Sequence, residues 1–298
     1  WSSDVCSSDL LPPFFEHNIR AVYSKIEAVT SVSDITHSGI RECLKLVGID
    51  GNVEIHHDGD LPARSGLGSS SSFTVGLLNA LYRLSQFSVG RHALAELACS
   101  IEREKEGQVC GYQDQFAVAY GGINILEFSA EEPTLVKPLN LDFSRIKELE
   151  ENLFLVYTGL QRESSSLSSK LITRMKEKEL EFINLRDLVD KGAEVLLGNN
   201  NIREFGETLH EAWKIKRSLS DGITTTEIDL FYDTCYNLGA VGGKVLGAGG
   251  GGFILLFADP ASQKKIQSIL PIRNYLHVPF QFEFTGSEII YERDIRSF

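Results

Sequence analysis

The segment Pro62–Ser72 has the residue types and spacing that most clearly suggest chemistry. We call it the glycine-serine loop; it reads Pro-Ala-Arg-Ser-Gly-Leu-Gly-Ser-Ser-Ser-Ser, and apolar residues at helical spacing follow from Phe73. Gly66 and Gly68 can adopt positive φ, so their backbone amides can approach a ligand closely. A helix N-terminus also presents unbonded N–H groups and the positive end of the helix dipole. The segment is therefore predicted to hold an anion such as a phosphate group.

The spacing of the glycine-serine loop does not fit two common phosphate motifs. No Gly-Lys-Ser/Thr follows the first glycines, as a Walker P-loop requires, and the spacing does not fit a dinucleotide fingerprint. The alternative is a serine-rich loop that only caps a helix. A second glycine run, Gly247–Gly252, precedes a buried strand and is here called the glycine turn. It could be only a flexible turn, but ordering so many glycines is costly, which favours a close backbone approach there.

Together the two runs resemble signatures of the GHMP kinases, the family of galactokinase, homoserine kinase, mevalonate kinase and phosphomevalonate kinase. The loop's Pro-x-x-x-Gly-Leu-Gly-Ser-Ser resembles the second family signature, and Gly-Ala-Gly-Gly-Gly in the glycine turn resembles the third. The resemblance implies phosphoryl transfer from ATP to a small molecule. The residues implied to bind the nucleotide are Pro62, Arg64, Ser65, Gly66, Leu67, Gly68, Ser69, Ser70, Ser71, Gly247, Gly249 and Gly250.

Two acidic residues extend this resemblance. Cys110-Gly-Tyr-Gln-Asp-Gln resembles a segment of galactokinase-like members, where the Asp is the proposed base and a Glu twelve residues upstream binds magnesium. Glu102 and Asp114 have that separation. The resemblance implies that Asp114 accepts the proton of the acceptor hydroxyl, and that Glu102 and Ser70 (or the adjacent Ser69) bind Mg²⁺. The alternatives are a solvated helix residue for Glu102 and a helix cap for Asp114.

Wider stretches resemble one sugar-phosphate branch of the family. Leu11–Phe15, Val22–Glu27 and His56–Asp60 resemble the branch that phosphorylates the anomeric hydroxyl of D-glycero-D-manno-heptose 7-phosphate, which implies a 1,7-bisphosphate product. Such a substrate needs a cationic anchor; Arg162 is the candidate for substrate binding and Arg64 a second one, with a surface arginine as the alternative for both. Two other functions stay open: another GHMP sugar kinase, acting on fucose or galactose, and a GHMP-fold sensor that binds sugar and nucleotide without turnover.

The expected architecture is an α+β, two-domain GHMP fold. The resemblance implies a mixed α/β, ATP-binding N-terminal domain over residues 11–152 and a ferredoxin-like α/β sandwich over residues 153–298. Around the candidate site, the apolar periodicity and the stop signals predict a strand at 19–26, helices at 73–84, 89–107 and 113–120, and a further strand at 280–285.

Residues 1–10 stand apart from the rest of the sequence. They contain Ser-Ser-Asp twice and have no clear strand or helix period, so we interpret them as a non-native segment and leave them out of the fold prediction. The first signature of the GHMP kinases does not appear near the start of the sequence. We therefore expect poor or no activity from this chain.

Composition and charge exclude several other classes. The formal net charge of −12 argues against a nucleic-acid binder, which needs a basic surface. No apolar run approaches the roughly 18 residues that span a bilayer, so no membrane partner is expected. The five cysteines form no Cys-x-x-Cys pair, which favours neither structural zinc nor a disulfide framework and makes the cytoplasm the simplest compartment. A homodimer is compatible with the sequence but is not indicated by it.

Overall fold

The structure is a computed structural model, in which the chain forms two compact units. It describes residues 4–10, 16–60, 66–105, 107, 109–160, 169 and 171–292. Of these, the N-terminal unit holds 4–10, 16–60, 68–105, 107, 109–122 and 283–292, and the C-terminal unit holds 66–67, 123–160, 169 and 171–282. The glycine-serine loop passes from one unit to the other between Leu67 and Gly68. The division into family domains at residue 152 stays a prediction.

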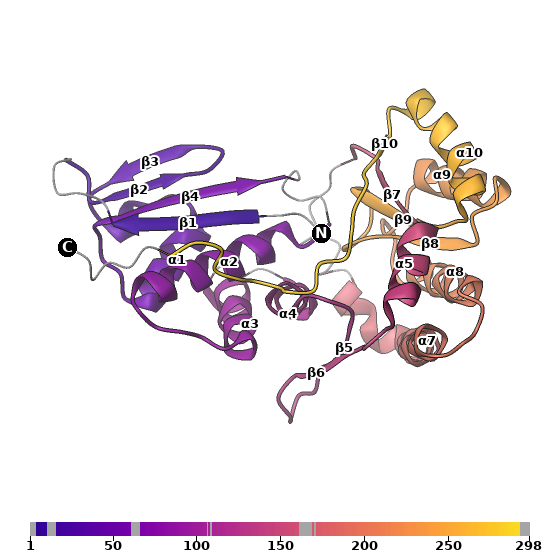
Figure 1. The fold of residues 1–298 in the computed structure, drawn as a ribbon, viewed down its shortest axis with the longest axis horizontal. Coiled ribbons are helices and arrows are strands. Elements are labelled where there is room, and N and C mark those ends of the chain that lie inside the picture. The colour runs from indigo at the N-terminus through magenta and orange to yellow at the C-terminus, as the bar shows by residue number, and fades with distance from the viewer. Residues whose placement is uncertain are drawn as a thin grey trace. The chain divides into compact units, whose positions relative to one another are not determined.

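A four-stranded sheet forms one layer of the N-terminal unit. Its strands are β1 (Asp4–Leu10), β2 (Ile19–Val22), β3 (Ile26–Val29) and β4 (Val53–Gly59), in the order β1-β4-β2-β3. β2 runs parallel to β4, whereas β1 and β3 are antiparallel to their neighbours. Side chains that alternate along β2 and β4 are fully buried, and Figure 1 shows the helices of this unit on one face of the sheet.

One expectation for this sheet is wrong. The predicted strand at 19–26 is a hairpin of β2 and β3, because the chain reverses where Tyr23 N–H donates to the Lys25 carbonyl at 2.8 Å. Residues 4–10, which the fold prediction left out, form β1, with Cys6 opposite His57 and Leu10 opposite Val53. Backbone pairing with β4 makes this strand despite its polar sequence.

Among its described residues, the N-terminal unit also contains the helices α1 (Ser38–Val47), α2 (Ser69–Leu84), α3 (Arg91–Ser100) and α4 (Gln113–Tyr120), with a 3₁₀ turn at Val32–Asp34. The helices predicted at 73–84 and 113–120 are confirmed as α2 and α4. The helix predicted at 89–107 is shorter, because α3 ends at Ser100 and a π-helical turn, Ile101–Lys105, follows it. Such turns often occur at functional sites.

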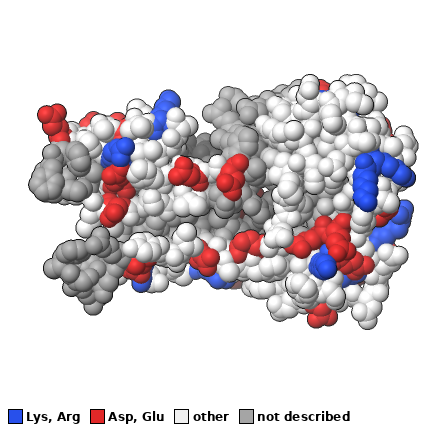
Figure 2. All heavy atoms as spheres, turned by 45° about the horizontal axis from the view of Figure 1, so that its top comes forward, with Lys and Arg blue, Asp and Glu red and all other residues white. Residues whose placement is uncertain are grey.

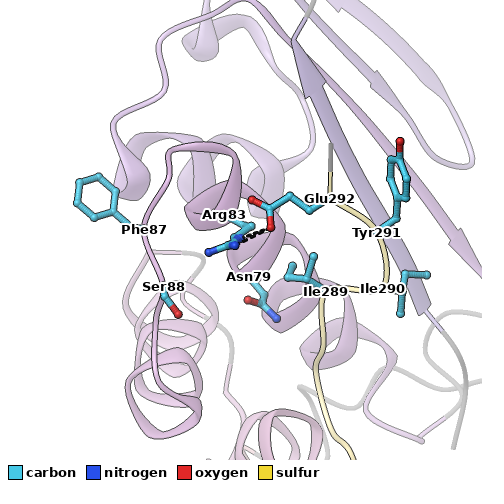
Figure 3. Close-up of a pocket in the computed structure, with 8 residues that line it drawn as sticks. All are labelled: Asn79, Arg83, Phe87, Ser88, Ile289, Ile290, Tyr291 and Glu292. Atoms are coloured by element: carbon cyan, nitrogen blue, oxygen red, sulfur yellow. Dashed lines mark hydrogen bonds and ion pairs between the residues drawn. The ribbon is translucent and has the colours of Figure 1, made fainter. Parts of the chain in front are cut away.

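The chain returns to the N-terminal unit at residue 283, and the strand predicted at 280–285 is absent. Gly122 N–H donates to the Glu283 carbonyl at 2.6 Å, and the Glu283 carboxylate accepts the Gly286 N–H at 2.7 Å, which bends the backbone. The segment then runs along α2. There it closes a pocket of about 320 Å³ (Figure 3) lined by Asn79, Arg83, Phe87, Ser88, Ile289, Ile290, Tyr291 and Glu292. This pocket lies toward the C-terminal end of α2, away from its first turn.

The C-terminal unit contains an antiparallel sheet in the order β10-β7-β9-β8 and a two-stranded ribbon. The sheet strands are β7 (Leu153–Tyr157), β8 (Gly242–Val245), β9 (Phe253–Phe257) and β10 (Leu276–His277), and the ribbon pairs β5 (Asn124–Glu127) with β6 (Leu135–Pro138). The helices are α5 (Phe143–Asn152), α7 (Glu179–Leu197), α8 (Arg203–Ser218), α9 (Thr226–Asn237) and α10 (Pro260–Ile269), with 3₁₀ turns at Met175–Lys178 and Pro271–Arg273.

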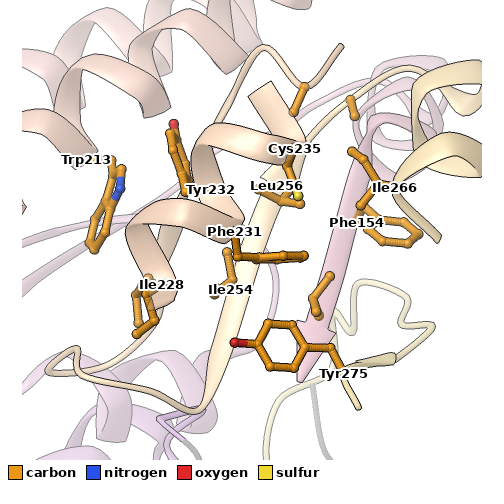
Figure 4. Packing of buried hydrophobic residues seen from close by; sticks show 14 of the residues in the cluster. Phe154, Trp213, Ile228, Phe231, Tyr232, Cys235, Ile254, Leu256, Ile266 and Tyr275 are labelled. Atoms are coloured by element: carbon orange, nitrogen blue, oxygen red, sulfur yellow. The ribbon is translucent and has the colours of Figure 1, made fainter. Parts of the chain in front are cut away.

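The core of the C-terminal unit lies between its sheet and its helices. Trp213 of α8, Phe231 of α9 and Ile254 of β9 are fully buried in one apolar cluster (Figure 4). Burial of such large apolar side chains is the main source of stability for this layer.

Within the described ranges, no helix combines the length and apolar character that a bilayer-spanning segment needs. Figure 2 shows acidic side chains spread over one face of the molecule.

Candidate active site at the start of α2

The first turn of α2 is free of side-chain capping. Its N-cap is Gly68, whose φ of 72° lies in the left-handed region, and no side chain caps the helix there. The first helical hydrogen bond runs from Ser72 N–H to the Gly68 carbonyl at 2.8 Å. The amides of Ser69, Ser70 and Ser71 therefore precede the internal hydrogen-bond ladder of the helix. Such groups, together with the helix dipole, suit an anionic ligand.

Asp114 stands beside this first turn. A Cβ atom built on Gly68 would lie 3.3 Å from the Asp114 Cβ and 3.4 Å from its Oδ2, so the missing side chain of Gly68 lets Asp114 stand here without a tight contact. Asp114 is the second residue of α4, whose N-cap is Tyr112, and no side chain caps α4. The helix-cap alternative for Asp114 is therefore not supported.

Asp114 is an exposed residue, but its carboxyl lies in a partly desolvated environment. Desolvation by the protein around it raises its pKa above the ordinary value of an aspartate. A raised pKa makes a carboxylate a stronger base once it is ionised. This property suits a group that must remove a proton from a hydroxyl.

Glu102 is the most deeply buried acidic group of the site, with 1% of its surface exposed. Its carboxylate accepts hydrogen bonds from the hydroxyls of Ser70 (3.0 Å), Ser71 (3.0 Å) and Thr74 (3.3 Å), and from Nε2 of Gln115. Burial raises the pKa of Glu102 above its usual range, although these hydrogen bonds oppose the rise. Glu102 is thus not a solvated helix residue, and the π-helical turn holds it against α2.

The group around Glu102 fits a magnesium ion in its chemistry. Mg²⁺ prefers oxygen ligands and is commonly held by one or two carboxylates together with substrate phosphates. Glu102 and Ser70 supply a carboxylate and a hydroxyl oxygen within 3.0 Å of each other at the phosphate-binding end of α2. No cluster of three or more His, Cys, Asp or Glu is found among the described residues, and this kind of site does not require one.

Three residues support the site that the sequence analysis did not single out. Thr74 lies four residues after Ser70, so helical spacing could have placed it on the same face. Gln115 contacts Glu102 only through the fold, and no local signal predicts that contact. Arg103 donates to the Cys110 carbonyl at 2.6 Å and stacks on Tyr112 at 4.1 Å, which fixes the segment leading into α4.

In the C-terminal unit, the glycine turn packs against the beginning of the glycine-serine loop. Gly247, with a φ of 63°, lies so close to Gly66 that a Cβ atom on Gly247 would be 2.8 Å from the Gly66 Cα. Gly249 and Gly250 lie instead against Ile223, to whose carbonyl Gly250 N–H donates at 2.8 Å. Leu67 is half-buried. Pro62, Arg64, Ser65 and Arg162 lie outside the described residues.

The comparisons with known proteins decide the family. The family model described as "GHMP kinases N terminal domain" matches residues 35–122, and "GHMP kinases C terminal" matches residues 193–276. The D-glycero-alpha-D-manno-heptose 7-phosphate kinase of Campylobacter jejuni is 32% identical over 236 residues, covering 78% of this chain and 69% of that enzyme. The chain belongs to the GHMP kinase family.

This GHMP kinase has further relatives. The galactokinase of Pyrococcus furiosus is 28% identical over 266 residues, covering 80% of this chain and 72% of the galactokinase. A crystal structure titled as a D-glycero-D-manno-heptose 1-phosphate kinase from Bacteroides thetaiotaomicron shares the fold, with a TM-score of 0.71, 24% identity, and coverage of 96% of this chain and 87% of that one. The chain is therefore an ATP-dependent kinase of small molecules with the two-domain GHMP fold.

Replacing Gly68 tests the contact between the first turn of α2 and Asp114. Gly68→Ala puts a Cβ in the left-handed region and 3.3 Å from Asp114, so we expect a loss of about 1–2 kcal/mol in the free energy of unfolding. Displacement of Asp114 should also lower kcat at least about tenfold. Gly90→Ala is the matched control, because Gly90 has a φ of −68° and no atom within 4 Å of a built Cβ. Equal kcat values for Gly68→Ala and Gly90→Ala would contradict the contact between Gly68 and Asp114.

Proposed function

We propose that this GHMP kinase transfers the γ-phosphoryl group of ATP to the anomeric hydroxyl of D-glycero-D-manno-heptose 7-phosphate, giving the 1,7-bisphosphate. The observation that carries this proposal is the grouping of Asp114 and the buried Glu102 at the uncapped first turn of α2. The 32% identity to the Campylobacter jejuni kinase supports the choice of sugar.

Each group has one role in the proposed reaction. The amides at the start of α2 bind the phosphates of ATP. Asp114 takes the proton of the anomeric hydroxyl as the sugar oxygen bonds to the γ-phosphorus, and the bond from that phosphorus to the β–γ bridging oxygen breaks to release ADP. Glu102 and Ser70 would hold Mg²⁺, which neutralises charge on the β- and γ-phosphates when bound.

A coupled assay of ADP release with a panel of acceptors tests the choice of substrate. The panel contains the heptose 7-phosphate, the heptose 1-phosphate, fucose, galactose and mevalonate. The assay is run on this chain and on a chimera in which the amino-terminal residues of the Campylobacter jejuni kinase replace residues 1–10. We expect turnover of the heptose 7-phosphate at least about 100-fold above that of the unphosphorylated sugars. A site that binds the 7-phosphate makes no such contacts with an acceptor that lacks a phosphate, and its polar groups are then left unpaired.

Other outcomes of the panel would reject the proposal. Preference for galactose or fucose would assign the specificity of a galactokinase or fucokinase, in line with the similarity to the Pyrococcus furiosus galactokinase. ATP binding without turnover of any acceptor by the chimera would indicate a sensor. A preference for the heptose 1-phosphate would mean that a hydroxyl other than the anomeric one is phosphorylated.

The pH dependence of kcat/KM follows from the pKa of Asp114. The base must be ionised, and its pKa is raised by desolvation, so activity should fall as the pH drops through a value above the ordinary aspartate pKa of about 3.9. We expect an acid limb above that value in the pH profile of the chimera. Activity that stays constant down to pH 4 would contradict the role of Asp114 as the base.

A further inference from the structure

Lys216, near the C-terminal end of α8, spans a junction in the backbone of the C-terminal unit. Its Nζ donates to the carbonyl of Val245 at 3.2 Å and to the carbonyl of Gly247 at 2.7 Å. Val245 is the last residue of β8, and Gly247 is the first residue of the glycine turn. One side chain thus fixes both the strand end and the turn that follows it.

The glycine turn then determines where Gly66 can lie. A Cβ atom built on Gly66 would be 3.1 Å from the Leu246 carbonyl oxygen, and one built on Gly247 would be 3.1 Å from the Gly66 carbonyl oxygen. The two backbones are therefore packed directly against each other, with no side chain between them to absorb a shift. A movement of Gly247 must move Gly66, the first described residue of the glycine-serine loop.

We propose that Lys216 is a positioning residue for ATP binding: it fixes the glycine turn, and the turn fixes the backbone of Gly66 in the glycine-serine loop. The proposal rests on the nucleotide-binding role of that loop. It does not depend on which sugar is the acceptor. Lys216 acts through the turn and is not itself placed on the nucleotide.

The electrostatics of Lys216 support a functional reason for its placement. Burial, together with the nearby Lys244 of β8, lowers the pKa of Lys216 to about 7, and burial also lowers the pKa of Lys244. Among the ion pairs of the described residues, none involves either lysine. Two desolvated cations without an acidic partner are costly for stability alone. Stability alone therefore does not explain why a lysine stands beside the glycine turn.

The test compares ATP with adenosine, which has no phosphate for the loop to hold. Isothermal titration of the full chain at pH 7 measures both dissociation constants for the parent, Lys216→Met, Lys216→Arg and Lys214→Met. Lys214 is an exposed residue of the same helix and serves as the matched control. We expect Lys216→Met to bind ATP about tenfold more weakly, which corresponds to about 1.4 kcal/mol, with adenosine binding unchanged.

The remaining variants separate positioning from folding. Lys216→Arg keeps a charged donor of different shape and should recover part of the ATP affinity. Lys214→Met should bind both ligands like the parent. If thermal unfolding shows that Lys216→Met does not fold, Lys216→Arg carries the test and must show a selective loss of ATP affinity.

Three results would overturn the inference. Equal ATP affinity for Lys216→Met and the parent would show that the turn does not need the lysine. An equal loss of ATP and adenosine affinity would assign Lys216 a purely structural role. A parent chain that binds adenosine but not ATP would reject the phosphate-binding role of the glycine-serine loop, and this inference with it. The choice of heptose phosphate as the acceptor does not affect the measurement.

Discussion

Asp114→Asn in the chimera should lower kcat by about 10²–10⁴-fold while leaving ATP affinity within about twofold of the parent. The amide has nearly the same shape as the carboxylate, so the contact with Gly68 is preserved. It cannot accept the proton of the acceptor hydroxyl, so the loss should fall on the chemical step. Steady-state kinetics and ATP titration together measure the two effects.

A structural role for Asp114 would give a different pattern. If the residue only supported the first turn of α2, its replacement would weaken ATP binding as much as turnover. Asp142→Asn provides a control for the substitution itself, because Asp142 is an exposed residue of the C-terminal unit at the N-cap of α5. A kcat for Asp114→Asn within tenfold of the parent would contradict its assignment as the base.

Glu102→Gln is the second replacement with a large expected effect. Glutamine removes the charged ligand proposed for Mg²⁺, so we expect kcat/KM to fall by about 100-fold or more and the Mg²⁺ concentration for half-maximal rate to rise. Glu104→Gln is the matched control, because Glu104 lies two residues away in the same π-helical turn and is exposed. An unchanged Mg²⁺ requirement in Glu102→Gln would contradict the metal assignment.

Although Glu102→Gln should lower kcat/KM, it should not lower the stability of the fold at neutral pH. Burial raises the folded-state pKa of Glu102, so the folded state binds more protons than the unfolded state between the two pKa values. Its contribution to stability is therefore present at low pH and is lost as the pH rises through the raised pKa. At neutral pH the variant should melt at a temperature at least as high as the parent. A Tm several degrees lower would mean that Glu102 is mainly structural.

The helix ends at the candidate site depend on a few neighbouring residues, and these could be predicted from the sequence. Glycines followed by helix-spaced apolar residues mark the start of α2, and Gly121, with a φ of 65°, ends α4 where the sequence predicted. These signals depend on a few neighbouring residues, so no knowledge of the fold is needed to interpret them. The family resemblance then supplied the roles proposed for the acidic residues.

The environment of Glu102 could not be predicted in the same way. Its neighbours Arg103, Glu104 and Lys105 are charged, which is typical of a solvated helix face. The carboxylate is buried because the π-helical turn directs it toward α2, whose hydroxyls come from about 30 residues earlier in the chain. Only the tertiary fold brings these groups together.

Strand pairing also depends on partners distant in the sequence. The polar residues of β1 have no clear period, and the strand exists through its register with β4. Residues 280–285 carry alternating aromatic residues, but Phe282 N–H donates to the Glu150 carboxylate at 2.8 Å instead of to a neighbouring strand. Both cases show tertiary contacts overriding local propensity.

³¹P NMR of the product tests whether the phosphoryl group is transferred to the anomeric hydroxyl of the heptose 7-phosphate. The chimera is incubated with ATP, Mg²⁺ and D-glycero-D-manno-heptose 7-phosphate, with the Asp114→Asn chimera in parallel. We expect a new phosphate signal that is coupled to the anomeric proton and grows together with ADP, and almost none with the variant. Formation of ADP without that signal, or equal signals from both proteins, would contradict this transfer.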